Sequence, residues 1–289
     1  MNYLKNVQIG INYIEANLDF DMTLSQIAKE AGLSQWHFQR IFKALTNETL
    51  KTYIRSRRLA NSLDKLLTTD LRIIDIALPS GYESQESFTR AFKATFNLTP
   101  KEYRKLGDKN LFLKKLEFDS EYLKHINQNI SLKPEIYTQR LMKLVGLKTC
   151  FYSIDSEKNN IGEKLPALWA DFLARMTEIE DVVAGTCYGV VRQIKDDTDQ
   201  LEYYAVIEVN EIQRLPKNME SIEIPLSTYA KFTHRGEVKY IDNTVNYIYS
   251  SWLLNSGKSH TSGADLEVYD HEYDPVSENS VMYYAIPIE

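Results

Sequence analysis

The feature that most constrains this chain is a repeat within its first hundred residues. When the sequence is shifted by 50 positions, residues 34–53 align with residues 84–103. The identical pairs are Ser34/Ser84, Gln35/Gln85, Phe38/Phe88, Arg40/Arg90, Phe42/Phe92, Lys43/Lys93, Ala44/Ala94, Asn47/Asn97, Thr49/Thr99, Lys51/Lys101 and Tyr53/Tyr103. A repeat of this length indicates two copies of one small structural unit.

Each copy carries the signals of two helices joined by a tight turn. Thr23 and Gln26 form a capping-box pattern, and Gly32 can adopt the positive φ that ends the first helix. Ser34 then caps the following helix, as Ser84 does in the second copy. The pattern predicts two helix-turn-helix units, whose second helices can enter the major groove of DNA.

The second helix of each unit has a polar face that suits base contacts. Trp36 lies off the apolar stripe formed by Phe38, Ile41, Phe42 and Leu45, among glutamine and arginine side chains. Arginine bonds guanine, glutamine bonds adenine, and an aromatic ring packs against thymine methyl groups. We therefore predict DNA contacts from an exposed face of Gln35, Trp36, Gln39, Arg40 and Lys43, and from Gln85, Glu86, Thr89 and Arg90. The alternative is that Trp36 packs on a neighbouring helix or on the other half of the chain.

Residues 49–67 lack glycine and proline and predict a long helix between the two units. Its length of about 27 Å is near the spacing of successive major grooves, about 34 Å. Arg57, with Arg55 and Arg58, could reach phosphates, or these arginines could form local ion pairs on a solvated face. Pro79 lies just before Gly81 and predicts an early end to the first helix of the second unit.

Charge separates the two halves of the chain. Residues 1–107 hold 15 Lys and Arg against 11 Asp and Glu, whereas the remainder is strongly acidic. A basic front and an acidic back suggest different partners. The two cysteines are too few for a zinc module or disulfide framework, so neither metal nor cofactor is expected. With no basic leader or long apolar run, we expect a cytoplasmic protein without membrane contact.

Residues 1–107 resemble the DNA-binding domain of the AraC/XylS family of transcription regulators, particularly its Rob-like branch. The match is carried by SQWHFQRIFK, YIRSRRL, DIAL, ESQESFTRAFK and TPKEYRK. The resemblance implies an all-α double helix-turn-helix domain that binds double-stranded promoter DNA. It also implies RNA polymerase as a partner and leaves open whether the protein activates or represses.

The second half shows strand and helix patterns and a fainter repeat. LMKLVGLKT and YAVIEV have the composition of strands, and residues 163–176 place apolar side chains on one helical stripe. LEYYAVIEV (201–209) resembles VMYYAIPIE (281–289), which suggests two strand-helix-strand-strand repeats in an α+β domain. We predict a connecting segment at 108–124 and this second domain at 125–289.

FTHRGEV, SSWLLNSG, LEVYDHEYDP and VMYYAIPI resemble the GyrI-like effector-binding domain. That resemblance implies a groove for small, often cationic and aromatic molecules, with Glu267 at the position of the family's glutamate. Strand alternation sends Leu266 and Val268 to one face and Glu267 and Tyr269 to the other. The candidate aromatic walls are Trp252, Tyr269, Tyr204, Tyr229 and Tyr283, with an ordinary surface role for Glu267 as the alternative.

The five histidines show no metal or triad spacing, so no catalytic residue is predicted. His234 is expected to make structural hydrogen bonds. Two further functions stay open, a GyrI-like small-molecule hydrolase and a drug-sequestering protein tethered to DNA. The predicted function is transcription regulation under the control of a small effector.

Overall fold

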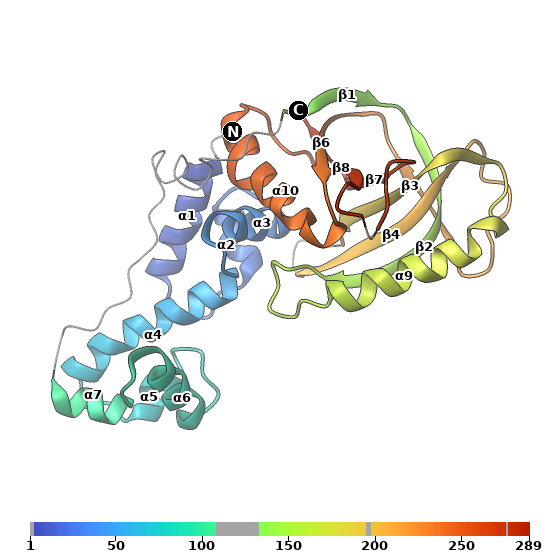
Figure 1. The fold of residues 1–289 in the computed structure, drawn as a ribbon. Helices are drawn as coiled ribbons and strands as arrows, with labels where there is room; N and C mark the ends of the chain where they lie inside the picture. Colours follow the sequence, from blue (N-terminus) through green and yellow to red (C-terminus); the bar gives the residue numbers. More distant parts are fainter. Residues whose placement is uncertain (1–2, 108–132, 195–197, 276) are drawn as a thin grey trace.

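The computed structural model describes residues 3–107, 133–194, 198–275 and 277–289. A helical N-terminal domain packs against a C-terminal domain built on a curved sheet (Figure 1). The predicted connection 108–124, and the predicted start of the second domain at 125, lie outside the described residues.

The N-terminal domain contains the two predicted helix-turn-helix units. Its helices are α1 (Tyr3–Ala16), α2 (Leu24–Glu30), α3 (Gln35–Thr46), α4 (Leu50–Thr68), α5 (Ile73–Ala77), α6 (Gln85–Phe96) and α7 (Pro100–Leu106). Thr23 and Gln26 form the capping box, and Ser34 and Ser84 accept hydrogen bonds from backbone N–H groups at the starts of α3 and α6. Gly32 adopts the positive φ expected of it, 68°.

The second unit differs from the first at its turn, as Pro79 predicts. Helix α5 ends at Ala77 and α6 begins only at Gln85, so the turn is longer than the one between α2 and α3. The long helix α4 connects the units and holds the second unit away from the sheet (Figure 1). A separate apolar cluster around Phe88 and Phe92 stabilises this second unit.

The C-terminal domain has one antiparallel sheet in the order β1-β6-β8-β7-β3-β4-β2-β5. The strands are β1 (Glu135–Gln139), β2 (Met142–Tyr152), β3 (Val182–Gln193), β4 (Gln200–Val209), β5 (Glu220–Ile224), β6 (Ser227–Arg235), β7 (Asp265–Tyr269) and β8 (Val281–Ile288). Its main helices are α9 (Ile161–Arg175) and α10 (Ile241–Tyr247), the latter continued by a π-helical turn, η3 (Ile248–Trp252), and by α11 (Leu253–Asn255).

The predicted duplication is confirmed. Strand β2, helix α9 and strands β3 and β4 form one copy, and β6, α10, β7 and β8 form the other. The copies join where β3 pairs with β7, and Gly189 of β3 lies opposite Glu267 of β7 at the middle of this pairing. This central position lies on the pseudo-twofold axis of the sheet.

Side chains alternate between the two faces of the sheet, apart from a register irregularity in β3 between Val182 and Cys187. On the helical face, Tyr203 and Ala205 pack with α9 while Tyr284 and Ile286 pack with α10 and η3. The opposite face carries its own apolar cluster, which includes Tyr204, Tyr229 and Leu266. Whether a residue is at an odd or an even position along its strand therefore decides on which face of the sheet its side chain lies.

Among the described residues, no helix is long and apolar enough to cross a membrane. The same residues contain no group of three or more metal-ligating side chains that could hold an ion.

Candidate functional site

Helix α6 presents its polar face to solvent. Gln85, Glu86 and Arg90 are exposed and Thr89 is half-buried, while Phe88 and Phe92 point into the second unit's core. The capped start of α6 and its left-handed C-cap at Asn97 define a helix of three turns. This is the accessibility that the sequence predicts for a helix that enters a groove.

Helix α3 does not present its polar face to solvent, which corrects the prediction of an exposed surface. Gln35, Trp36, Gln39 and Arg40 are only 4%, 5%, 4% and 6% exposed. The C-terminal domain covers them, because α3 packs against α10 and η3. The alternative for Trp36, packing on the other half of the chain, is therefore the arrangement in this conformation. Figure 1 shows α3 lying beside α10.

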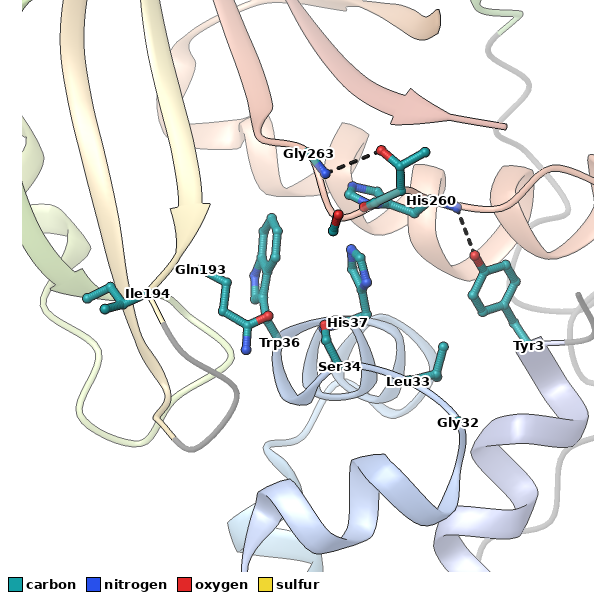
Figure 2. A pocket seen from close by; sticks show the side chains of 12 residues that line it. Tyr3, Gly32, Leu33, Ser34, Trp36, His37, Gln193, Ile194, His260 and Gly263 are labelled. Carbon is teal, nitrogen blue, oxygen red and sulfur yellow. Dashed lines mark hydrogen bonds between the residues drawn. The ribbon is translucent and has the colours of Figure 1, made fainter. Parts of the chain in front are cut away.

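Trp36 is inserted into the apolar cluster of the other domain. It belongs to the cluster that packs α9 on the sheet, together with Phe151, Val191 and Phe172. Figure 2 shows Trp36 and His37 projecting from α3 toward the segment that carries His260 and Gly263. A pocket of about 410 Å³ remains between the domains here, lined partly by Tyr3, Trp36, His37 and His260.

The pocket is lined by aromatic rings, and some of its buried polar atoms lack a hydrogen-bond partner among the described residues. The His37 and His260 rings lie 4.0 Å apart between centroids. Burial lowers the pKa of His37 well below its ordinary value, and repulsion from His260 and Arg40 lowers it further. The Trp36 indole N–H and the His37 Nε2 atom are both buried without a hydrogen-bond partner.

Arg40 makes a buried ionic contact between the domains, whereas the pairs Lys51–Asp199 and Arg55–Glu157 are more exposed. The Nη1 atom of Arg40 lies 3.4 Å from Asp155 Oδ2, and both side chains are buried. Burial lowers the pKa of the guanidinium, but the combined attraction of Asp155, Tyr284, Tyr249 and Asp242 outweighs this effect, so the pKa is raised. Its carbon Cζ also lies 5.5 Å from the ring centroid of Tyr249, within cation–π range.

Two further basic side chains predicted to contact DNA have other partners in this conformation. Arg57 donates two hydrogen bonds to Glu15, at 2.8 and 2.9 Å, so it forms the local ion pair that was the alternative to phosphate contact. Lys43 is half-buried and donates to the carbonyl of Asn47.

Glu267 lies on the helical face of the sheet, held by two phenols. Its Oε2 accepts hydrogen bonds from the hydroxyls of Tyr203 and Tyr269, the latter at 2.8 Å. Trp169 on α9 donates its indole N–H to the Tyr203 oxygen at 2.9 Å, and its ring meets Tyr269 edge-on at 5.0 Å. Burial raises the pKa of Glu267, and the two phenol hydrogen bonds oppose that rise.

Gly189 makes the close approach at Glu267 possible. A Cβ atom at this position would lie 2.1 Å from the Tyr203 hydroxyl and 2.6 Å from Glu267 Oε2. The glycine faces Glu267 directly across the β3–β7 pair. A residue without a side chain is therefore needed for the carboxylate and the phenol to meet.

A second carboxylate lies two residues earlier on the same strand and face. Asp265 accepts hydrogen bonds from the hydroxyls of Tyr249 and Tyr284, both at 2.8 Å, and bonds His260 Nε2 at 2.7 Å. It is fully buried. Two carboxylates, surrounded by aromatic rings, thus occupy one face of β7, an arrangement that can hold a cation.

Comparison with known proteins decides the family. A family model for helix-turn-helix domains matches residues 27–106, and a model of integron-associated effector-binding proteins matches residues 135–288. The transcriptional regulator Rob of Salmonella typhimurium is 27% identical over 258 residues, which cover 89% of this chain and 87% of Rob. Regulatory protein SoxS of Escherichia coli is 40% identical over 104 residues, covering 36% of this chain and 97% of SoxS. This chain belongs to the family of integron-associated effector-binding proteins and joins that domain to an AraC-type helix-turn-helix domain, which is the Rob-like architecture.

One solved structure, that of SAV2435 bound to tetraphenylphosphonium, covers 54% of this regulator and 94% of its own chain, with 15% identity and a TM-score of 0.45. The Rob-like architecture makes this chain a DNA-binding transcription regulator with an effector-binding domain for small molecules.

The regulator's aromatic wall at Glu267 differs from the predicted one. Of the predicted residues only Tyr269 contacts the carboxylate. Tyr204 and Tyr229 belong to the cluster on the opposite face, and Tyr283 shares that parity on β8 and bonds Glu272. Trp252 packs edge-on against Phe232 at 5.0 Å, in the cluster of α10.

Sequence reasoning missed Tyr203, Trp169 and Asp265. Trp169 belongs to the predicted helical stripe of residues 163–176, and strand alternation puts Asp265 on the same face as Glu267. Tyr203 and Tyr204 are adjacent, so choosing between them requires the register of β4 against β3. His234 has the structural role expected of it, because its ring bonds Thr244 and the carbonyl of Glu237.

Proposed function

We propose that this regulator senses a small organic cation with a planar or aromatic part, and that the cation binds at Glu267. The observation that carries the proposal is a half-buried carboxylate that accepts hydrogen bonds from Tyr203 and Tyr269, while the indole N–H of Trp169 donates to the Tyr203 oxygen. A carboxylate removed from water gains most from a ligand that restores an opposite charge. The surrounding rings supply cation–π and stacking surface.

We also propose that both second helices of the helix-turn-helix units contact promoter DNA and that RNA polymerase is a further partner. The exposure of Gln85, Glu86 and Arg90 supports this role for α6. For α3 the role requires that the C-terminal domain leave its polar face. Rob and SoxS are named as regulators, which favours a domain that binds its effector without converting it chemically. We also propose that the protein acts in the cytoplasm, where promoter DNA lies.

Calorimetric titration tests the effector chemistry. N-methylquinolinium serves as the cation and quinoline N-oxide as a neutral molecule of similar shape. We expect the wild type to prefer the cation, and Glu267→Gln to lose about 2 kcal/mol of its binding free energy, roughly thirtyfold in affinity. Equal wild-type affinities for the two molecules would contradict a site that reads charge.

A further inference from the structure

Arg40 lies in a site that the other domain builds from acidic and aromatic groups. We call it the Arg40 site and define it by Asp155, Asp242, Tyr249 and Tyr284, all of which act electrostatically on the guanidinium. Asp155 makes the ion pair and Tyr249 the cation–π contact. The guanidinium thus meets the kind of surroundings that a bound organic cation would require.

The Arg40 site is electrostatically continuous with the effector site. Tyr249 and Tyr284 both donate to Asp265, which shares its strand face with Glu267. The positive charge of Arg40 opposes the rise in the pKa of Glu267 that burial causes. A second cation arriving at Glu267 would therefore repel the guanidinium already present.

We call the arrangement in which α3 packs against the C-terminal domain the docked state. Its interface contains polar atoms that lack hydrogen-bond partners within the described part of the chain. The described residues contain six buried side-chain polar atoms that lack a hydrogen-bond partner. Four of them lie at this interface, on Trp36, His37, Arg40 and Asp155. Buried polar atoms without partners destabilise the state that contains them, so the docked state is poised to open.

We propose that Arg40 is an internal ligand of the effector domain, and that an external organic cation and the docked helix α3 exclude one another. This inference rests on the proposed function, because it assigns the regulation of the same effector site. The docked state masks the α3 face that carries Gln35, Trp36, Gln39 and Arg40. Cation binding releases this face for DNA, whereas α6 is accessible in both states.

Cation affinity provides the first test, independent of DNA. Removing the internal competitor in Arg40→Ala should tighten binding of N-methylquinolinium by about fivefold or more. Arg72→Ala is the matched control, since Arg72 is an exposed arginine of the same domain that pairs only locally, with Asp75. Equal affinities of the wild type and Arg40→Ala would overturn the competition. Absence of binding by every variant would overturn the effector chemistry as well.

Hydrogen–deuterium exchange of the full chain provides the second test. Asp155→Asn should speed exchange in residues 35–46 and 240–252 without any ligand, and should tighten binding to a duplex selected from a random library. Asp171→Asn, which removes a carboxylate from an exposed residue of α9, is the control. Exchange unchanged in Asp155→Asn would overturn the proposal. Faster exchange with no specific DNA binding by any variant would contradict DNA recognition and uphold the role of Asp155.

Discussion

At the scale of single residues, Glu267 shows how burial and hydrogen bonds oppose each other at a ligand site. Burial favours the neutral acid, while the hydroxyls of Tyr203 and Tyr269 favour the carboxylate. The net effect is a raised pKa, so the empty site carries an energetic cost at neutral pH. A cation that restores the missing charge removes part of that cost.

This balance predicts how the stability of Glu267→Gln depends on pH. Because the folded-state pKa is raised, ionised Glu267 destabilises the fold above that pKa, and the penalty disappears below the unfolded-state value, about 4.3. Without ligand, Glu267→Gln should therefore be more stable than the wild type at pH 7.5. The difference should shrink on acidification toward pH 4. Thermal unfolding at several pH values measures this, and a difference that grows in acid would contradict the assignment.

Gly189 provides a steric test of the same site. A methyl group there would collide with the Tyr203 hydroxyl and Glu267 Oε2, so Gly189→Ala should displace both. We expect a loss of about 1–3 kcal/mol in stability and at least tenfold in affinity for N-methylquinolinium. Gly162→Ala on α9 is the control, because a Cβ there meets nothing within 4 Å. Equal behaviour of the two variants would mean that the close approach has no role.

Strand alternation is sufficient to place Glu267 and Tyr269 together, but it cannot select the aromatic partner across the sheet. Tyr203 faces Glu267 and Tyr204 faces away only because Gly189 pairs with both Glu267 and Ala205. A one-residue change of register would exchange the two tyrosines. The sequence therefore predicts the shared face of Glu267 and Tyr269, but not that Tyr203, rather than Tyr204, lies on that face.

At the scale of elements, the two second helices share a sequence pattern but differ in surroundings. Their caps, turns and apolar stripes follow from local signals, and the structure confirms them. The burial of α3 depends instead on Asp155 and His260, more than 100 residues away in the sequence. No periodicity within residues 34–46 reports such a partner, so the masked face was predicted to be exposed.

The exposure of α6 predicts that Arg90 contributes to DNA binding even in the docked state. Arg90→Ala should weaken binding to a selected duplex by about 1–3 kcal/mol and relax preference at one base pair. Thr95→Ala is the control, since Thr95 lies on the same helix and bonds its own backbone at Ala91. Fluorescence anisotropy at fixed salt measures both variants. An equal loss for Arg90→Ala on selected and random DNA would show phosphate contact only.

At the scale of the whole molecule, a large apolar cluster spans the two domains. Residues of α1 and α3 pack in it together with residues of β6, β8 and η3. Undocking exposes this apolar surface to water, which costs a free energy of roughly 25 cal/mol for each Å² exposed. The four interface polar atoms that lack a protein partner in the described ranges lower the stability of the docked state. Apolar burial favours the docked state and the unpaired polar atoms oppose it, so a ligand can shift the equilibrium between the docked and undocked states.

Coupling of this kind must be reciprocal. If a cation favours release of α3, then DNA bound to α3 favours the cation by the same factor. The expected coupling is about 1–3 kcal/mol, or roughly 5- to 150-fold. The sequence predicts the two domains and their ligand classes, whereas the contact that connects them is visible only in the folded chain.

The most direct measurement is the affinity of the full chain for a selected duplex with and without saturating N-methylquinolinium, at one salt concentration. We predict that the cation tightens DNA binding by the wild type about fivefold or more and has little effect on DNA binding by Glu267→Gln. Unchanged DNA affinity of a wild-type protein that calorimetry shows to be saturated with the cation would contradict this prediction.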